Sequence, residues 1–180
     1  MKTLKEQISK EQWTQIREIY REAFPKAEQK PFFLIKRLVK SKKAQVFLSA
    51  EGGMVQGFLL AIPFGDTVMV DYLAVSGKIR SKGIGSTLIR EACGYYSGKT
   101  VVLLIERLRD NAENQKQRIA RKNFYLKNGF TTPDIFITGR SGEMEVLSCG
   151  GIISPQEYLD LQKYSMGNWM FRLSGIQLSI

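Results

Sequence analysis

The sequence contains no histidine and only two cysteines, and these shortages remove several kinds of catalytic site. A structural or catalytic zinc site is built mainly from His and Cys ligands, and a Ser-His or Cys-His catalytic unit needs an imidazole base. The sequence therefore predicts no metal site and no such unit. Cys93 falls on the apolar face of an expected helix and Cys149 near the end of an expected strand, so we predict buried, reduced thiols.

Long hydrophobic runs are also missing. No apolar stretch approaches the roughly 20 residues of a membrane span, and residues 1–6 do not have the pattern of a signal peptide. We therefore expect a cytoplasmic protein without a membrane segment. With 180 residues, 43% hydrophobic and 24% charged, the chain has the composition of a globular protein and the length of one well-buried domain.

Acidic residues are the scarcer charged class, with 17 Asp and Glu against 27 Lys and Arg, which gives a net charge of +10. Such an excess can indicate nucleic acid, an acidic partner or simple solubility. The basic residues are scattered without an uninterrupted tract of four, and no nucleic-acid motif is recognisable. A nucleic-acid role is therefore a minor hypothesis, and a ligand with several phosphates accounts for part of the charge more economically.

The most informative stretch is a strand, a loop and a helix that follow one another from residue 67. β-Branched and apolar residues up to Val75 predict a strand that stops before Gly77. From Ile84 onward, apolar residues recur at helical spacing. An amphipathic helix therefore begins within the Arg-x-x-Gly-x-Gly segment, residues 80–85.

The turn before this helix is suited to bind an anion. The first N–H groups of a helix have no partner within it, and the helix dipole adds about half a positive charge there. Gly83 and Gly85 lack a Cβ, so a ligand can approach the backbone closely. Lys78, Arg80 and Lys82 add positive charge around the same turn. A phosphate or pyrophosphate is the ligand that this arrangement fits best.

Two common phosphate loops do not fit the pattern. A dinucleotide fold requires Gly-x-Gly-x-x-Gly, but Leu88 occupies the third glycine position, and the chain has no Gly-Lys-Ser/Thr of a P-loop. The remaining pattern resembles the acyl-CoA pyrophosphate loop of the GNAT superfamily of N-acetyltransferases. A second block, Phe-Tyr-x-x-x-Gly-Phe at residues 124–130, resembles the one that closes the coenzyme-side helix of that superfamily. The resemblance spans about residues 44–150.

This resemblance implies an α/β (α+β) fold, with a mixed, mostly antiparallel central sheet, a parallel central strand pair and helices on both faces. A single domain would span residues 1–180, with its core at about residues 44–150. Helices at residues 9–41 would wall the acceptor side. The tail, residues 151–180, is apolar enough to cover either its own sheet or another subunit, so a homodimer stays open.

Local patterns place most of the elements. Ser9 and Gln12 have the form of a capping box at the start of the first helix. Residues 51–53, Glu-Gly-Gly, favour a hairpin turn between two strands. We expect strands at residues 45–50, 53–62, 67–75, 101–105, 130–138 and 143–148, a helix that ends at about residue 127, and a short helix at residues 155–164.

The resemblance also implies which residues hold acetyl-CoA, the expected co-substrate. A strand bulge would free backbone groups for the pantetheine arm, and amides near Leu73 and Val75 would act as an oxyanion hole. Arg118 replaces an asparagine that contacts the pantetheine in many members, and Arg118 or Arg121 would instead reach a phosphate. The coenzyme-binding residues expected are Leu73, Ala74, Val75, Arg80, Ser81, Lys82, Gly83, Ile84, Gly85, Ser86 and Arg118.

The resemblance assigns Tyr125 as the proton donor to the departing thiolate, with aromatic packing as the alternative. An alkyl amine has a pKa near 10.4, so a base must accept its proton at neutral pH. Glu106, at the end of a buried strand, and Asp71, in the neighbouring strand, are the candidates. Each is alternatively a salt-bridge partner of Arg107 or Lys78.

Together these features predict an N-acetyltransferase that moves the acetyl group of acetyl-CoA directly to a primary amine of a small molecule or a peptide. The alternatives are a non-catalytic acyl-CoA sensor or interaction module of the same fold, and a basic nucleic-acid binder. Fold does not fix the acceptor, and residues 9–43 carry no readable motif. Phe24, Phe32 and Phe33 would touch the acceptor or, as is usual for such helices, pack in the core.

Overall fold

The computed structural model describes residues 7–79, 82–109, 112–140 and 142–179. These residues fall into two compact units. The first comprises the chain up to Pro63 together with Val70–Tyr95, and the second comprises Phe64–Met69 and the chain from Tyr96 onward. No helix in the described ranges is long and apolar enough to cross a membrane.

The first unit begins with two helices, α1 (Lys10–Ala23) and α2 (Phe32–Lys40), joined through the short 3-10 helix η1 (Lys26–Glu28). The capping box predicted for α1 is confirmed. The Gln12 N–H donates to Oγ of Ser9 at 3.2 Å, and the Ser9 N–H donates to Oε1 of Gln12 at 3.1 Å. Two otherwise unpaired backbone groups are thereby satisfied, which fixes where α1 begins.

Three strands contribute to this unit: β1 (Gln45–Glu51), β2 (Met54–Phe64) up to Pro63, and β3 (Thr67–Val75) from Val70 onward. β1 and β2 pair antiparallel through the predicted hairpin. Gly52 and Gly53 at its tip have φ values of 55° and 79°, the left-handed values that a tight hairpin turn requires. The hairpin predicted from these two adjacent glycines is therefore confirmed.

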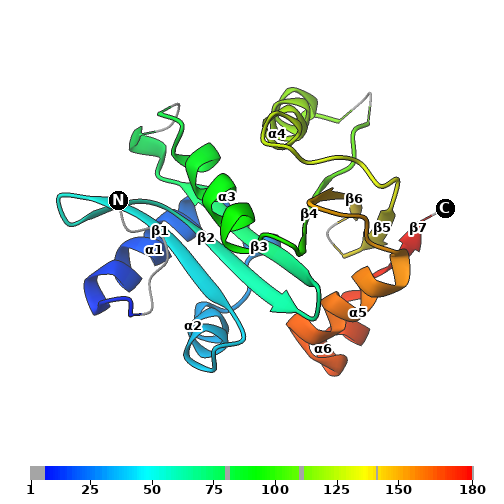
Figure 1. The fold of residues 1–180 in the computed structure, drawn as a ribbon, viewed down its shortest axis with the longest axis horizontal. Helices are drawn as coiled ribbons and strands as arrows, with labels where there is room; N and C mark the ends of the chain where they lie inside the picture. The colour runs from blue at the N-terminus through cyan, green and yellow to red at the C-terminus, as the bar shows by residue number, and fades with distance from the viewer. Residues whose placement is uncertain (1–6, 80–81, 110–111, 141, 180) are drawn as a thin grey trace. The chain divides into compact units, whose positions relative to one another are not determined.

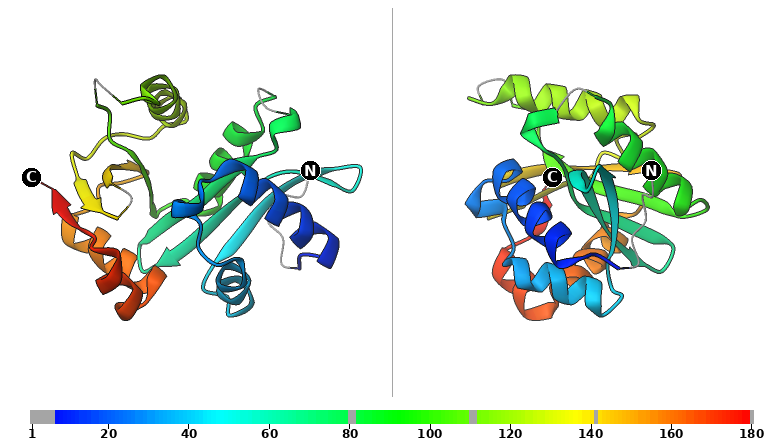
Figure 2. Two further views of the ribbon diagram at one scale, coloured as in Figure 1. Left: turned by 180° about the vertical axis from the view of Figure 1, so that it is seen from behind. Right: turned by 90° about the vertical axis from the view of Figure 1, so that its left-hand side faces the viewer.

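Helix α3 (Ile84–Tyr95) lies on the opposite face of these strands from α1 and α2 (Figures 1 and 2). Leu88 and Ile89 on its inner side are fully buried. At its end, the Tyr95 ring stands edge-on to Phe47 of β1, with 5.7 Å between the ring centroids. The start of α3 confirms the prediction that a helix begins within the glycine-rich segment.

The second unit contains strands β4 (Thr100–Glu106), β5 (Phe136–Gly139), β6 (Gly142–Cys149) and β7 (Gln177–Ser179), and helix α4 (Gln115–Lys127). β6 pairs antiparallel with β4 on one side and with β5 on the other. β5 in turn pairs antiparallel with β7, which is contributed by the C-terminal tail.

The C-terminal part differs from the prediction in two places. The strand expected over residues 130–138 pairs regularly only in its last part, because Thr131 makes just an isolated bridge to Ser148. The tail forms α5 (Pro155–Met166) and α6 (Asn168–Ser174) and then adds β7 to the sheet. The sequence left open whether the tail covers its own sheet or another subunit. In the structure, β7 of the tail pairs with β5 of its own sheet.

The strand order is β1-β2-β3-β4-β6-β5-β7, antiparallel except for the parallel neighbours β3 and β4. The predicted fold class, a mostly antiparallel mixed sheet flanked by helices, is therefore confirmed. Cys93 and Cys149 are not joined in a disulfide, and both are half-buried, so the prediction that they are buried is wrong. A single domain over residues 1–180 stays a prediction.

Candidate functional site

The predicted phosphate turn lies in the first unit, where the chain passes from β3 to α3. Arg80 and Ser81 lie outside the described residues. Gly83 has a φ of 76°, a left-handed value that residues with a Cβ rarely adopt. The Thr87 N–H donates to the Gly83 carbonyl at 2.9 Å and opens the hydrogen-bond ladder of α3, so the Ile84 amide precedes that ladder.

The surroundings of this turn are basic. Lys82 is exposed beside Gly83, and the first turn of α3, which includes Gly85 and Ser86, contains no acidic residue. The helix dipole adds positive potential at the same end. A phosphate group binds to backbone N–H groups and to cationic side chains, and the turn offers both. The glycine lacks a side chain that would block access to the backbone.

The residues expected to hold the acetyl end of the coenzyme form the last part of β3. Ala74 is buried, and Leu73 and Val75 on the other face are half-buried, as the alternation of a strand requires. Gly57 of β2 backs this segment closely. A Cβ at Gly57 would lie 2.8 Å from the Ala74 carbonyl oxygen and 3.3 Å from Cα of Val75. The expected bulge in β3 stays a prediction.

Asp71, one of the two candidate bases, is held by Lys30 rather than by the partners that the sequence suggested. The Lys30 Nζ donates to both carboxylate oxygens of Asp71 at 2.8 Å. The next residue, Tyr72, donates its hydroxyl to the Glu28 carbonyl at 3.0 Å and accepts from the Lys30 N–H at 3.3 Å. Two adjacent side chains thus fix β3 to the connection between α1 and α2.

A second tyrosine completes this cluster. The Tyr20 hydroxyl donates to the Lys30 carbonyl at 3.2 Å, and its ring stands edge-on to Tyr72 at 4.8 Å. Burial raises the pKa of both tyrosines above the usual value, and the charge of Asp71 raises the pKa of Tyr72 further. Both hydroxyls are therefore protonated at neutral pH and act as hydrogen-bond donors.

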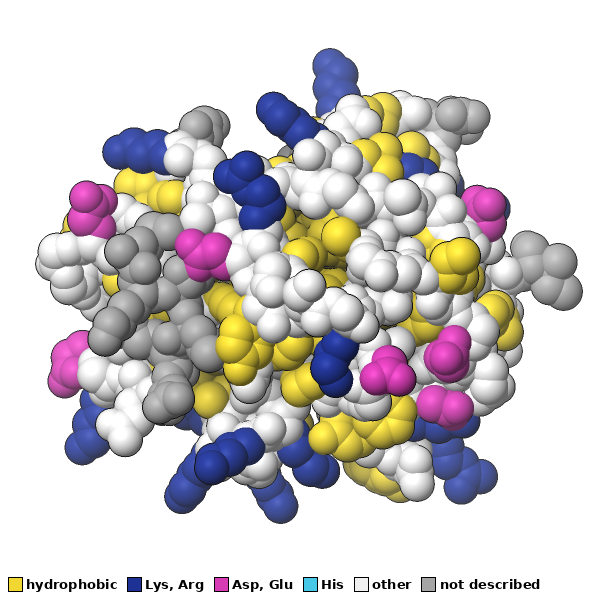
Figure 3. Space-filling model, in the orientation of Figure 1, with side chains coloured by type: hydrophobic (Ala, Val, Ile, Leu, Met, Phe, Trp, Pro, Cys, Tyr) yellow, Lys and Arg dark blue, Asp and Glu magenta, His cyan; other side chains and the backbone are white. Residues whose placement is uncertain are grey.

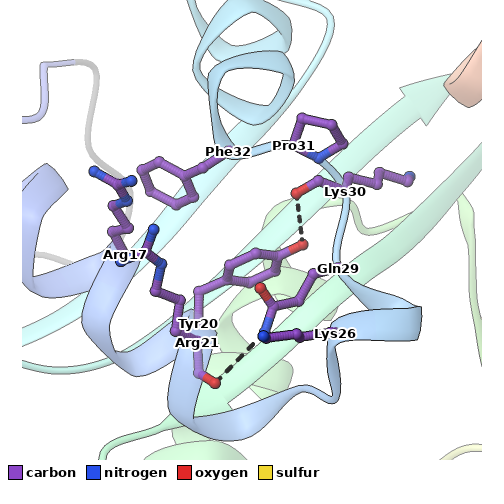
Figure 4. Close-up of a pocket in the computed structure, with 8 residues that line it drawn as sticks. All are labelled: Arg17, Tyr20, Arg21, Lys26, Gln29, Lys30, Pro31 and Phe32. Carbon is purple, nitrogen blue, oxygen red and sulfur yellow. Dashed lines mark hydrogen bonds between the residues drawn. The ribbon is translucent and has the colours of Figure 1, made fainter.

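A cavity of about 300 Å³ adjoins this cluster, between α1 and the start of α2 (Figure 4). Tyr20 and Phe32 line it together with basic side chains. Of the three phenylalanines that the sequence left open, Phe32 lines this cavity. Phe24 packs on Tyr72 at 4.9 Å, whereas Phe33 is 67% exposed. The tyrosine cluster and the cavity were not predicted, because the contacts that form them join distant parts of the sequence.

In the second unit, Glu106 ends β4 among donors from the first turns of α4. Its Oε1 accepts from the Asn114 amide at 3.0 Å and lies 3.1 Å from Nη2 of Arg118. Its Oε2 lies 3.0 Å from Nη1 of Arg121 and 3.3 Å from the same amide. These contacts use the roughly four lone-pair positions of a carboxylate. Glu106 can accept a proton only if one donor moves, and its role as base stays a prediction.

Arg118 is engaged on three sides. Its Nε donates to Oδ1 of Asn114 and its Nη1 to the Arg107 carbonyl, each at 2.7 Å, while Nη2 faces Glu106. A guanidinium group held in this way braces the start of α4. The expected contact of Arg118 with the coenzyme would require these bonds to be exchanged, and it also stays a prediction. Arg107, suggested as a partner of Glu106, instead lies 3.8 Å from Glu143.

Tyr125 lies near the end of α4, half-buried and surrounded by aromatic rings. Its ring stands edge-on to Phe124 at 5.0 Å and to Phe130 at 5.6 Å. Burial raises the pKa of the Tyr125 hydroxyl to about 12, and the nearby charge of Arg121 opposes part of this rise. The hydroxyl is therefore protonated at neutral pH, as a proton donor must be.

Comparisons with known proteins give a family and a fold. The family model described as an acetyltransferase (GNAT) domain matches residues 42–132. A search of curated proteins found no match. A structure assigned to the GNAT acetyltransferases from Bacteroides thetaiotaomicron superposes with a TM-score of 0.66 at 18% identity, over 92% of this chain and 93% of that one.

Two further structures are similar over most of the chain. The ribosomal-protein-S18-alanine N-acetyltransferase from Escherichia coli has a TM-score of 0.63 at 15% identity, over 86% of this chain and 96% of that one. A Bacillus subtilis acetyltransferase in complex with CoA has a TM-score of 0.60 at 15% identity, over 81% and 95%. At such identities the superpositions establish the shared fold.

Proposed function

Because the chain belongs to the GNAT acetyltransferase family, we propose that it transfers the acetyl group of acetyl-CoA to a primary amine. The observation that carries the proposal is the family match over residues 42–132, which includes both the phosphate turn and Tyr125. The fold is shared with a protein that was solved with CoA and with one that is an N-acetyltransferase. Both support a CoA-type donor and an amine acceptor.

The turn before α3 is the proposed binding site of the coenzyme pyrophosphate. The amides at the start of α3, from Ile84 to Ser86, would donate to phosphate oxygens, and Arg80, Ser81 and Lys82 would complete the site from the preceding loop. The left-handed Gly83 supports this role, because it leaves the backbone accessible at the turn. Arg118 could reach the coenzyme only by leaving its partners in the second unit.

The transfer itself needs a polarised thioester carbonyl. The amine nitrogen attacks the carbonyl carbon, the C–S bond breaks, and the thiolate leaves with a proton. We assign stabilisation of the developing oxyanion to the backbone amides near Leu73 and Val75, an effect of about 3 to 4 kcal/mol per donor in well-measured enzymes. The close packing of Gly57 behind this segment supports a fixed backbone position.

Tyr125 is the proposed proton donor to the thiolate. Its pKa of about 12 means that nearly every molecule carries the proton at neutral pH. Such a donor typically contributes about two to four orders of magnitude to the rate. The aromatic rings of Phe124 and Phe130 hold the side chain in a defined position, which a donor needs.

The acceptor amine must lose a proton before or during attack. We retain Glu106 as the proposed base, with the condition that one of its donors moves aside or that a water molecule relays the proton. Because both Glu106 and Asp71 are ion-paired, a second candidate function has specific support, namely an acyl-CoA-binding module that does not catalyse.

Turnover separates these two functions. The protein is incubated with acetyl-CoA and a panel of primary amines, and release of the free CoA thiol is followed together with the mass of the acetylated amine. The enzyme hypothesis expects thiol release that depends on at least one amine. Binding of acetyl-CoA without acetylation of any amine would instead identify the non-catalytic module.

A further inference from the structure

The part of the first unit that precedes β1 carries much of the positive charge of the chain. Residues 7–43 contain ten Lys or Arg and four Glu. Figure 3 shows one face of the molecule, and Lys and Arg side chains gather at its lower edge, around α2. A surface of this kind raises the local concentration of anions within a Debye length, about 8 Å at physiological ionic strength.

Within this part, the cavity of about 300 Å³ collects four cationic side chains (Figure 4). Arg17 and Arg21 come from successive turns of α1, Lys26 from η1 and Lys30 from the residues before α2. In Figure 4 the side chains of Arg17 and Arg21 both extend from α1 toward the side on which the Phe32 ring lies. None of the described residues that line the cavity is acidic.

This arrangement leaves an excess of positive charge. Like charges four residues apart on a helix repel each other. Lys30 is neutralised by Asp71, but among the ion pairs of the described residues none involves Arg17, Arg21 or Lys26. An anion between the two guanidinium groups would relieve their repulsion and accept planar, paired hydrogen bonds.

The cavity is tied to the strand that is proposed to hold the acetyl group. Lys30 lines the cavity and donates to Asp71 of β3, and Leu73 follows two residues later on the same face of the strand. Tyr20, whose ring forms part of the wall, packs against Tyr72 of the same strand. Two residues of the cavity wall are therefore in direct contact with β3.

We infer that this cavity binds an anionic group, a carboxylate or a phosphate, of the acceptor. The acceptor is then a primary amine that also bears a negative charge. Tyr20, Pro31 and Phe32 give the cavity an apolar side, which strengthens the attraction between the arginines and the anion. That the bound molecule is acetylated rests on the proposed function, whereas its binding in the cavity does not.

Binding of matched probes tests the inference. Phosphoethanolamine is compared with ethanolamine, and β-alanine with its amide, by NMR titration of the full chain. In each pair the charged member should bind at least tenfold more tightly, and the double variant Arg17→Gln/Arg21→Gln should lose this difference. Lys10→Gln changes an exposed cation of α1 that does not line the cavity, and it should leave both affinities unchanged. Equal affinity within each pair, or binding of neither member, would overturn the inference.

Kinetics separate this inference from the proposed function. With an anionic amine as acceptor, the double variant should raise the KM for the amine about tenfold to a hundredfold, with kcat and the KM for acetyl-CoA unchanged. If neutral amines are acetylated equally well and the variant has no effect, the inference fails and the proposed function stands. If anionic probes bind in the cavity but no amine is acetylated, the proposed function fails and the anion site stands.

Discussion

At the scale of single residues, the proposed chemistry depends most on the Tyr125 hydroxyl. Tyr125→Phe removes this hydroxyl and keeps the ring contacts with Phe124 and Phe130. We expect kcat to fall about 10² to 10⁴-fold, with little change in the affinity for acetyl-CoA, as measured by steady-state kinetics and calorimetry. Tyr164→Phe, which changes a ring stacked on Phe64 at 4.5 Å, is the matched control. An unchanged kcat in Tyr125→Phe would make Tyr125 a packing residue.

The pH dependence of transfer follows from the same hydroxyl. Because its pKa is raised to about 12, the donor loses its proton only as the pH rises through that value. The acceptor amine, with a pKa near 10.4, gains its neutral form about tenfold per pH unit below that value. We therefore expect kcat/KM for the amine to rise from pH 7 to pH 9 and not to fall before pH 10. A falling limb above pH 8 would indicate a different acid.

Two glycines test whether the backbone of β3 must hold its position. In Gly57→Ala the new methyl group would lie 2.8 Å from the Ala74 carbonyl oxygen, so one of the two strands must shift. We expect a loss of about 1–3 kcal/mol in unfolding free energy and a lower transfer rate. Gly94→Ala is the control, since nothing lies within 4 Å of its Cβ position in α3, and it should stabilise by about 0.5–1 kcal/mol. Equal effects of the two changes on thermal unfolding would contradict this packing.

At the scale of the elements, α4 is attached by charge more than by apolar packing. None of its residues, Gln115–Lys127, all of them described, is buried. Arg118 and Arg121 contact Glu106 of β4, and Lys122 donates to Glu145 of β6 at 2.7 Å. The helix that carries Tyr125 is thus positioned by ion pairs.

Glu106→Gln tests this attachment. The change keeps the size of the side chain and removes the charge that Arg118 and Arg121 face, so thermal unfolding should show a loss of about 1–3 kcal/mol. Glu143→Gln, in which the carboxylate that pairs with Arg109 is 30% exposed, should reduce stability less, because solvent screens such a pair. If Glu106 is also the base, kcat falls far more than stability does at a temperature where the variant is folded. Losses of equal size in Glu106→Gln and Glu143→Gln would contradict the cluster.

The elements that sequence predicted are those specified by local rules. The capping box at Ser9 and the hairpin at Gly52 each depend on side chains within a few residues. β7 was not predicted, because a three-residue edge strand shows no periodicity and is defined by its pairing with β5. The partner of Asp71 was not predicted either, since Lys30 lies 41 residues away and only tertiary packing brings it near.

The same distinction applies to the candidate site. The start of α3 within the glycine-rich segment was expected from the change of periodicity, whereas the left-handed conformation of Gly83 was not predicted. The pairing of Glu106 was predicted with the wrong arginine, because the register of α4 over β4 selects Arg118 and Arg121 instead of the adjacent Arg107. The family pattern identifies the candidate site residues, and tertiary packing determines which hydrogen bonds and ion pairs their side chains form.

At the scale of the whole molecule, the central claim is that this chain binds acetyl-CoA through the turn before α3. The most direct test is a thermal-shift titration with acetyl-CoA and CoA, with NAD and ATP as controls. At about 100 times its dissociation constant, a ligand should stabilise the fold by roughly 2.7 kcal/mol, which is about 5–10 °C for a chain of this size. We predict this shift with acetyl-CoA and CoA only, and a weaker one in Arg80→Glu/Lys82→Glu. No shift with either coenzyme would contradict the donor site, and the proposed transfer with it.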